Sequence, residues 1–96
     1  MAKRAGKKGA VRLRLYVAGN APNSVRAIAN VKAMCLEHHE DKWEVEIVDL
    51  MEQPLRALAD EIIVTPTLLR LQPLPMRRVI GNLNDVGQVF LALGAK

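Results

Sequence analysis

The sequence contains few of the residues on which small redox, zinc-binding and disulfide-stabilised proteins depend. Cys35 is the single cysteine, so an internal disulfide, a two-cysteine redox cycle and a four-cysteine zinc site are excluded within one chain. No apolar run approaches the roughly 20 residues that span a membrane, and the N-terminus lacks the apolar core of a secretory signal. We therefore expect one small domain in the cytoplasm.

The excess of positive charge is confined to the start of the chain. The net charge is +4, and the basic residues within 1–10 account for all of it. Because this segment has almost no large apolar side chains, we predict a disordered basic tail over residues 1–10 and one folded domain over residues 11–96. Nucleic acid binding through the tail is an alternative function, but the tail has no aromatic side chains for base stacking, so nucleic acid is not the partner we expect.

The folded domain is neutral as a whole but divided by charge. Nine of its ten acidic residues lie between Glu37 and Glu61, whereas residues 11–36 and 62–96 have a basic excess. A domain divided in this way can attract partners of complementary charge, although solvated charged faces without a partner are the more common explanation.

Hydrophobic periodicity predicts three elements in the first half of the domain. Residues 11–17 alternate between apolar and polar side chains, as a half-buried strand does. Pro22 suits the first turn of a helix that we predict from about residue 24 to residue 38. The expected apolar stripe of this helix consists of Val25, Ile28, Val31 and Cys35. A second strand is predicted from Trp43, where apolar residues alternate with glutamates.

A short helix and a third strand are predicted next. Residues 53–59 favour a helix that has a proline near its start. One side of this helix consists of Leu55, Leu58 and Ala59. Residues 62–71 favour a strand, but Pro66 has no amide donor and must lie at the start or the edge of that strand.

The chain is predicted to finish with a hairpin strand and a helix. A proline-containing turn over residues 72–75 leads to a strand over residues 76–80, and Asn84 is expected to cap the last helix. The order β-α-β-α-β-β-α predicts an α/β fold with a four-stranded mixed sheet, in which a crossover helix makes the first two strands parallel. A proline before the third strand is typical of thioredoxin-like folds.

Several motifs, in their order and spacing, resemble the KaiB family of circadian-clock proteins. They are the segment from Leu15 to Ala27, Val48-Asp49 followed by Gln53-Pro54, Thr65 to Leu68, Leu71 before a proline-rich turn, and Arg77 to Gly81. Together they cover nearly all of residues 11–93. The ordered set is far more specific than any one of its motifs, so the chain is identified by resemblance as a member of this family.

The resemblance implies a non-enzymatic regulatory adaptor without a cofactor. Such an adaptor binds the hexameric clock ATPase KaiC and acts with another clock component or a histidine kinase. The resemblance also implies two folds, the thioredoxin-like order and a switched order, β-α-β-β-α-α-β, that assembles into a tetramer, so a homo-oligomer is expected. The loop with Gly81 and Asn82 is associated with the balance between the folds, and Asn82 replaces the aspartate usual in the family.

Four arginines occupy positions at which the family resemblance implies partner contact: Arg26, Arg70, Arg77 and Arg78. A planar guanidinium suits an interface because it can bind a carboxylate through two hydrogen bonds. A solvated surface arginine is the alternative explanation, and we favour it for Arg70. Glu46 and Glu61 replace basic or neutral residues of the family, which favours a divergent homologue in a related timing or stress system.

Redox and metal chemistry have weak support. The segment in which a thioredoxin has its cysteine pair, residues 21–24, contains no thiol here. Cys35 lies on a predicted apolar stripe, where a buried inert thiol is more common than a reactive one, and a monothiol redox protein is therefore only an alternative. His38 and His39 diverge by about 100° on a helix and form no metal-binding pair. A stand-alone module similar to the sensor domain of clock-associated histidine kinases is the remaining alternative.

Overall fold

The computed structural model describes residues 11–37 and 43–93. The predicted tail over residues 1–10 and the His38-His39 pair lie outside the described residues, so their predictions are not tested. None of the helices in the described ranges has both the length and the apolar character that a bilayer crossing requires.

Seven elements follow one another in the predicted order. They are β1 (Val11–Val17), α1 (Pro22–Glu37), β2 (Trp43–Asp49), α2 (Pro54–Ala59), β3 (Thr67–Gln72), β4 (Arg77–Ile80) and α3 (Val86–Leu93). The strands form one sheet in the order β2-β1-β3-β4. The β1–β2 pair is parallel, whereas β3 runs antiparallel to both β1 and β4. The predicted four-stranded mixed sheet is therefore confirmed.

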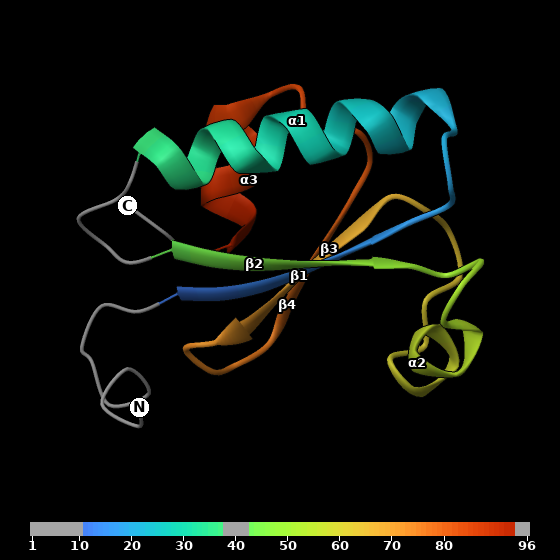
Figure 1. Cartoon of the computed structure of the whole chain (residues 1–96). Helices are drawn as coiled ribbons and strands as arrows, with labels where there is room; N and C mark the ends of the chain where they lie inside the picture. Colours follow the sequence, from blue (N-terminus) through green and yellow to red (C-terminus); the bar gives the residue numbers. More distant parts are fainter. Residues whose placement is uncertain (1–10, 38–42, 94–96) are drawn as a thin grey trace.

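The helices form unequal layers on the two faces of the sheet. Helices α1 and α3 cover one face, and α2 lies against the other face near one end (Figure 1). The larger core fills the space beneath α1 and α3, with Leu15, Val31 and Leu68 fully buried. A smaller core of Tyr16, Val48, Ala57 and Leu69 lies on the α2 side. Much of the α2 side of the sheet is left without a covering helix.

Strand β1 is central because its side chains are buried on both faces. Leu13 and Leu15 enter the larger core, whereas Tyr16 enters the smaller one. The alternation that predicted this strand therefore describes its first residues well. It does not describe the end of the strand, where Leu15, Tyr16 and Val17 are all buried in succession.

The apolar stripe predicted for α1 is displaced by about one residue. Val25 is 51% exposed, which contradicts its expected place in the core. The buried residues of this helix are Ser24, Ala27, Val31 and Met34. Ser24 lies on the inner side because its hydroxyl accepts a hydrogen bond from the Ala18 amide at 3.0 Å, which fixes the rotation of the first turn. Ile28 and Cys35 pack at the margin of the core.

The third strand begins only after Pro66, as the missing amide donor of that residue required. Residues 62–66, which the sequence also favoured as strand, form a loop instead. Thr67 stabilises the change of direction, since its hydroxyl donates to the Val64 carbonyl at 2.7 Å. The Pro66 carbonyl accepts a hydrogen bond from the Gly81 amide at 3.0 Å, which extends the pairing of β3 and β4.

The cap predicted for α3 was placed one residue too early. The Asp85 carboxylate, not the Asn84 side chain, accepts the Gln88 amide at 3.2 Å, which satisfies one of the free donors of the first turn. Asn84 instead accepts a hydrogen bond from the Asn30 amide group at 3.0 Å. The loop before α3 is thereby tied to α1.

Gly19 supplies a first test of the loop between β1 and α1. Its φ is +53°, and no atom lies within 4 Å of the position that a Cβ would occupy, so alanine meets only backbone strain there. We expect Gly19→Ala to lower the free energy of unfolding by about 1 kcal/mol, measured by urea denaturation. Gly87→Ala, inside α3, is the matched control and is expected to raise it by roughly 0.5–1 kcal/mol. Equal effects of the two variants would contradict the left-handed conformation of Gly19.

Candidate protein-contact surface

Helix α2 presents its leucines to solvent rather than to the core. Leu55 is 77% exposed and Leu58 is 73% exposed, whereas Ala57, on the opposite side, is buried. Met51, just before the helix, is 71% exposed. An amphipathic helix of a soluble domain normally turns its apolar side to the core, so this orientation creates an exposed apolar patch. We refer to Met51, Leu55 and Leu58 as the α2 patch.

A carboxylate at the end of α2 fixes this orientation. The Tyr16 hydroxyl donates to Asp60 at 2.6 Å, and the Arg14 guanidinium donates to the same carboxylate at 3.0 Å. Tyr16 is fully buried in the sheet, and its hydroxyl also lies 3.0 Å from the Arg56 carbonyl. Burial raises the pKa of Asp60, but the hydrogen bonds from Tyr16 and Arg14 outweigh that effect and lower it. The carboxylate is therefore ionised and holds the helix to β1.

Glu46 joins the same network from β2. Its carboxylate lies 2.8 Å from an Arg56 guanidinium nitrogen and 3.0 Å from Nε of Arg14. The hydrogen bond from Arg56, assisted by that from Arg14, lowers the pKa of Glu46 to about 2. Glu46 thus has a structural role, because it connects the edge strand β2 to α2.

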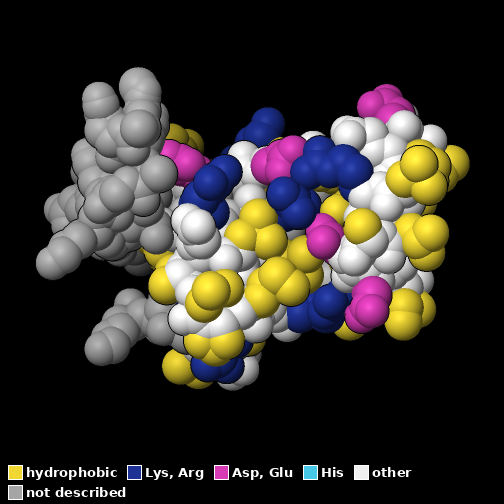
Figure 2. Space-filling view, turned by 90° about the horizontal axis from the view of Figure 1, so that it is seen from below, with side chains coloured by type: hydrophobic (Ala, Val, Ile, Leu, Met, Phe, Trp, Pro, Cys, Tyr) yellow, Lys and Arg dark blue, Asp and Glu magenta, His cyan; other side chains and the backbone are white. Residues whose placement is uncertain are grey.

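The face that surrounds α2 combines charged and apolar groups. In Figure 2, arginine and acidic side chains lie side by side there, with exposed apolar side chains between them. Pairs formed across neighbouring strands, such as Arg14 with Glu46, account for part of the charge. Within the described ranges, no group of three or more histidine, cysteine, aspartate or glutamate residues is placed to hold a metal ion. Large exposed apolar side chains beside charged groups make this face a candidate for contact with another protein.

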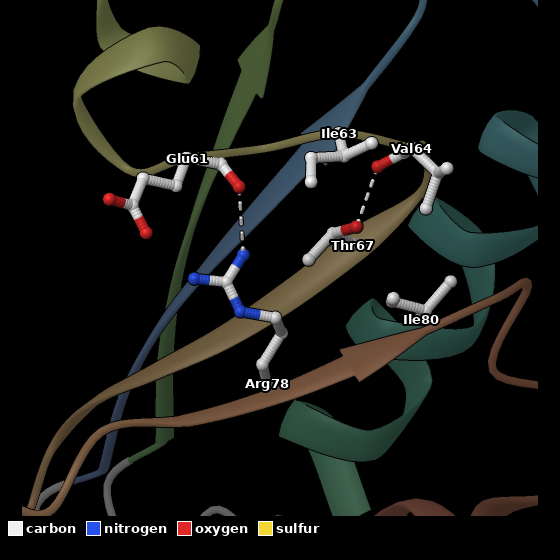
Figure 3. A pocket seen from close by; sticks show the side chains of 6 residues that line it. All are labelled: Glu61, Ile63, Val64, Thr67, Arg78 and Ile80. Carbon is white, nitrogen blue, oxygen red and sulfur yellow. Dashed lines mark hydrogen bonds between the residues drawn. The ribbon is translucent and has the colours of Figure 1, made fainter.

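A hollow of about 280 Å³ lies between the loop after α2 and the last two strands. Glu61, Ile63, Val64, Thr67, Arg78 and Ile80 line it (Figure 3). Arg78 reaches across the hollow, where its guanidinium nitrogens donate to the carbonyls of Glu61 at 3.3 Å and Asp60 at 3.2 Å. Arg78 thereby ties β4 to the segment that follows α2.

The four arginines expected at a partner interface are not gathered in one place. Arg26 is exposed on α1, and Arg77 and Arg78 are exposed on β4. Arg70 is only 7% exposed, so the solvated surface position that we favoured for it is wrong. Its guanidinium donates to the carbonyls of Leu93 and Pro75. In this fold the Arg70 guanidinium forms hydrogen bonds within the domain rather than with solvent.

The loop of Gly81 and Asn82 is held by α1 as well as by the sheet. The Asn30 side-chain amide donates to the Asn82 carbonyl at 2.8 Å. Gly81 has a φ of +123°, and Leu83, at +64°, is buried in the larger core. The structure describes this loop in one arrangement, and its predicted part in a switch between folds stays a prediction.

Sequence reasoning did not identify the network of Asp60, Tyr16 and Arg14. Each of these residues is of a common type, and they lie far apart in the chain. The strand pairing alone brings Arg14 opposite Glu46. The exposure of the α2 leucines had no signal in the sequence, because an isolated helix of this length has an apolar side whichever way it turns.

A family model described as the KaiB domain matches residues 14–94. Over 81 residues, the chain is 46% identical to the circadian clock protein KaiB3 of Synechocystis sp. and 42% identical to the circadian clock oscillator protein KaiB of Synechococcus elongatus. In each case the alignment covers 84% of this chain and 79% of the relative.

Solved structures share the fold at lower identity. The N-terminal domain of SasA from Synechococcus elongatus matches with a TM-score of 0.70 at 22% identity, covering 88% of this chain and 83% of that domain. The germline-specific thioredoxin Deadhead of a fruit fly, Drosophila melanogaster, matches with a TM-score of 0.74 at 12% identity, covering 95% of this chain and 87% of the thioredoxin. The fold is therefore thioredoxin-like.

The Glu46 network predicts a specific loss of stability in acid. Because the pKa of Glu46 is lowered to about 2, its contribution is complete above the ordinary glutamate pKa of about 4.3 and is lost as the pH falls toward 2. We expect Glu46→Gln to reduce the free energy of unfolding by about 1 kcal/mol at pH 6, the scale of a solvated ion pair, and by less at pH 3. Urea denaturation at both pH values measures this. Glu52→Gln, at an exposed glutamate just before α2, is the control. An effect of Glu46→Gln that is equal at both pH values would contradict the lowered pKa of Glu46.

Proposed function

The chain belongs to the KaiB family, and from this premise we propose that it is a non-enzymatic regulatory adaptor that binds a KaiC-like hexameric ATPase. The relatives it matches are named as circadian clock proteins, and a clock or a related timing or stress system is the setting we propose. Another clock component or a histidine kinase is a further proposed partner, on the ground of the family resemblance alone. We place the protein in the cytoplasm.

The exposed α2 patch is the observation that most supports an adaptor function. Leu55 and Leu58 point to solvent on a helix that ion pairs and a buried tyrosine hold in place, and Met51 is exposed just before that helix. Burying such side chains against a partner yields about 25 cal/mol for each Å² removed from water. A surface that is both apolar and rigid loses little conformational entropy on binding, which favours a protein partner.

Three of the arginines remain proposed partner contacts. Arg26, Arg77 and Arg78 have exposed side chains, as a contact requires. Arg70 is not included, because its guanidinium is buried and bonded to carbonyls.

The redox alternative is not favoured by the environment of Cys35. Burial raises the pKa of this thiol, which reduces the fraction of reactive thiolate at neutral pH. The position at the margin of the core agrees with a packing role.

Substitution in the α2 patch tests the adaptor function. We expect the unaltered protein to co-elute with a KaiC-type ATPase in the presence of ATP, and Leu58→Glu to weaken this on the order of tenfold or more by placing a charge in the buried part of the interface. Leu91→Glu, at an exposed leucine of α3, is the matched control and should bind normally. Absence of co-elution by the unaltered protein would reject the function, whereas normal binding by Leu58→Glu would reject only this surface.

Oligomeric state tests the proposed second fold. Native mass spectrometry and amide exchange on the same sample report the assembly and the hairpin over residues 67–80 together. We expect a monomer to have slow exchange across that hairpin, because β3 is buried between β1 and β4. A tetramer is expected to have a different exchange pattern after residue 50. A tetramer that retains the monomer pattern would contradict the link between assembly and the switched fold.

A further inference from the structure

Strand β4 forms an open edge of the sheet. It is the last strand in the order β2-β1-β3-β4 and pairs with β3 alone. Because the Gly81 amide bonds to the Pro66 carbonyl, the alternation of an antiparallel ladder directs the backbone groups of Arg78 and Ile80 away from β3. An extended segment of another protein can add to such an edge through main-chain hydrogen bonds.

A second hollow lies beside the end of this edge. Its volume is about 380 Å³, and its walls come from β4, the loop that follows β4, and α3. Val79, Leu83, Val89 and Ala92 give it an apolar lining. Asp85, also in the lining, accepts a hydrogen bond from the Gln88 amide as the cap of α3. The hollow is therefore suited to an apolar side chain rather than an acidic one.

The other end of the edge has positive charge without a matching carboxylate. The side chain of Arg77 forms no hydrogen bond or ion pair with another described residue, and Arg78 donates to the carbonyls of Glu61 and Asp60. Arg70 lies directly opposite Arg77 on β3 and also bonds only to carbonyls. Carbonyl oxygens do not neutralise a guanidinium, so this end of the edge is positively charged on both faces of the sheet, with Arg70 and Arg77 on one face and Arg78 on the other.

We propose that the β4 edge binds an extended acidic segment of a partner protein, which adds a fifth strand to the sheet. Side chains directly opposite one another on paired strands share a face and interact. Residues of the partner opposite Arg77 and Arg78 are acidic, and those opposite Val79 and Ile80 are apolar. The recognised pattern is therefore two adjacent acidic residues next to two adjacent apolar residues, with one apolar side chain in the hollow beside Val89 and Ala92.

The charge of the β4 edge also distinguishes it from the opposite edge of the sheet. Strand β2, the opposite edge, has no basic side chain of its own, and its exposed acids Glu44 and Glu46 already pair with Arg12 and Arg14, so it offers an acidic segment no partner for its charge. The partner segment therefore distinguishes the two edges by charge. The proposal rests on the proposed role of Arg77 and Arg78 as partner contacts and gives them a specific ligand, whereas the α2 patch is the proposed contact with the ATPase.

Short peptides with different residue orders test the proposal. The probes are fluorescein-labelled peptides with the core Glu-Glu-Val-Leu or the reversed core Leu-Val-Glu-Glu, one for each strand direction, and the composition-matched alternating core Glu-Val-Glu-Leu. Fluorescence anisotropy at low salt measures binding to the full chain. We expect one block peptide to bind at least several-fold more tightly than the alternating peptide. Equal binding of all three, or no binding of either block peptide, would overturn the proposal.

Variants and amide exchange identify the site. Arg77→Glu, at a side chain without a partner in the described part of the chain, should weaken binding of the block peptide about tenfold. Ala92→Trp should weaken that binding by filling the hollow. Lys32→Glu, at an exposed lysine of α1, changes the net charge by the same amount as Arg77→Glu; it is the control and should bind normally. Bound peptide should slow exchange of the Arg78 and Ile80 amides. Slowed exchange on β2 instead, or normal binding by both test variants with an unchanged thermal melt, would overturn the assignment.

Discussion

The carboxylate of Asp60 is the constraint on which the exposed surface depends. It receives hydrogen bonds from a buried tyrosine of β1 and from Arg14, and its position at the end of α2 sets how that short helix turns. Six residues of helix would not keep a fixed orientation through their own backbone hydrogen bonds. The polar network lets α2 pack through Ala57 alone and leaves its leucines in solvent. A polar cluster thus determines where the apolar surface lies.

Local patterns in the sequence were sufficient to predict most of the fold. Alternation identified β1, proline chemistry identified the start of α1 and of β3, and the crossover helix implied the parallel pair, all of which the structure contains. The errors concern rotation and extent. Val25 was assigned to the core because it is large and apolar, but the hydrogen bond from the Ala18 amide to Ser24 turns a small polar residue inward instead. Such a bond depends on tertiary geometry that periodicity does not contain.

The candidate site was less predictable than the fold, for a physical reason. The sequence did not distinguish Arg70 from the exposed arginines Arg77 and Arg78, yet its position in β3 faces the larger core and α3. Arg77 and Arg78 are adjacent, so the strand directs them to opposite faces of the sheet. The hollow beside Ala92 combines residues from β4, a loop and α3. Sequence could name the charged residues, but only the arrangement of strands and helices determines which of them share a surface.

The buried guanidinium of Arg70 has a consequence for how the second half of the chain can move. It joins the carbonyl of Leu93, at the end of α3, to that of Pro75, in the turn of the hairpin. Separating the helix from the hairpin would leave a charge buried without its acceptors, which is costly. Local opening is therefore expected to release α3 and the hairpin together, as one cooperative unit, while β1, β2 and α1 keep their contacts with one another. The Arg70 side chain thus couples the opening of α3 to the opening of the hairpin.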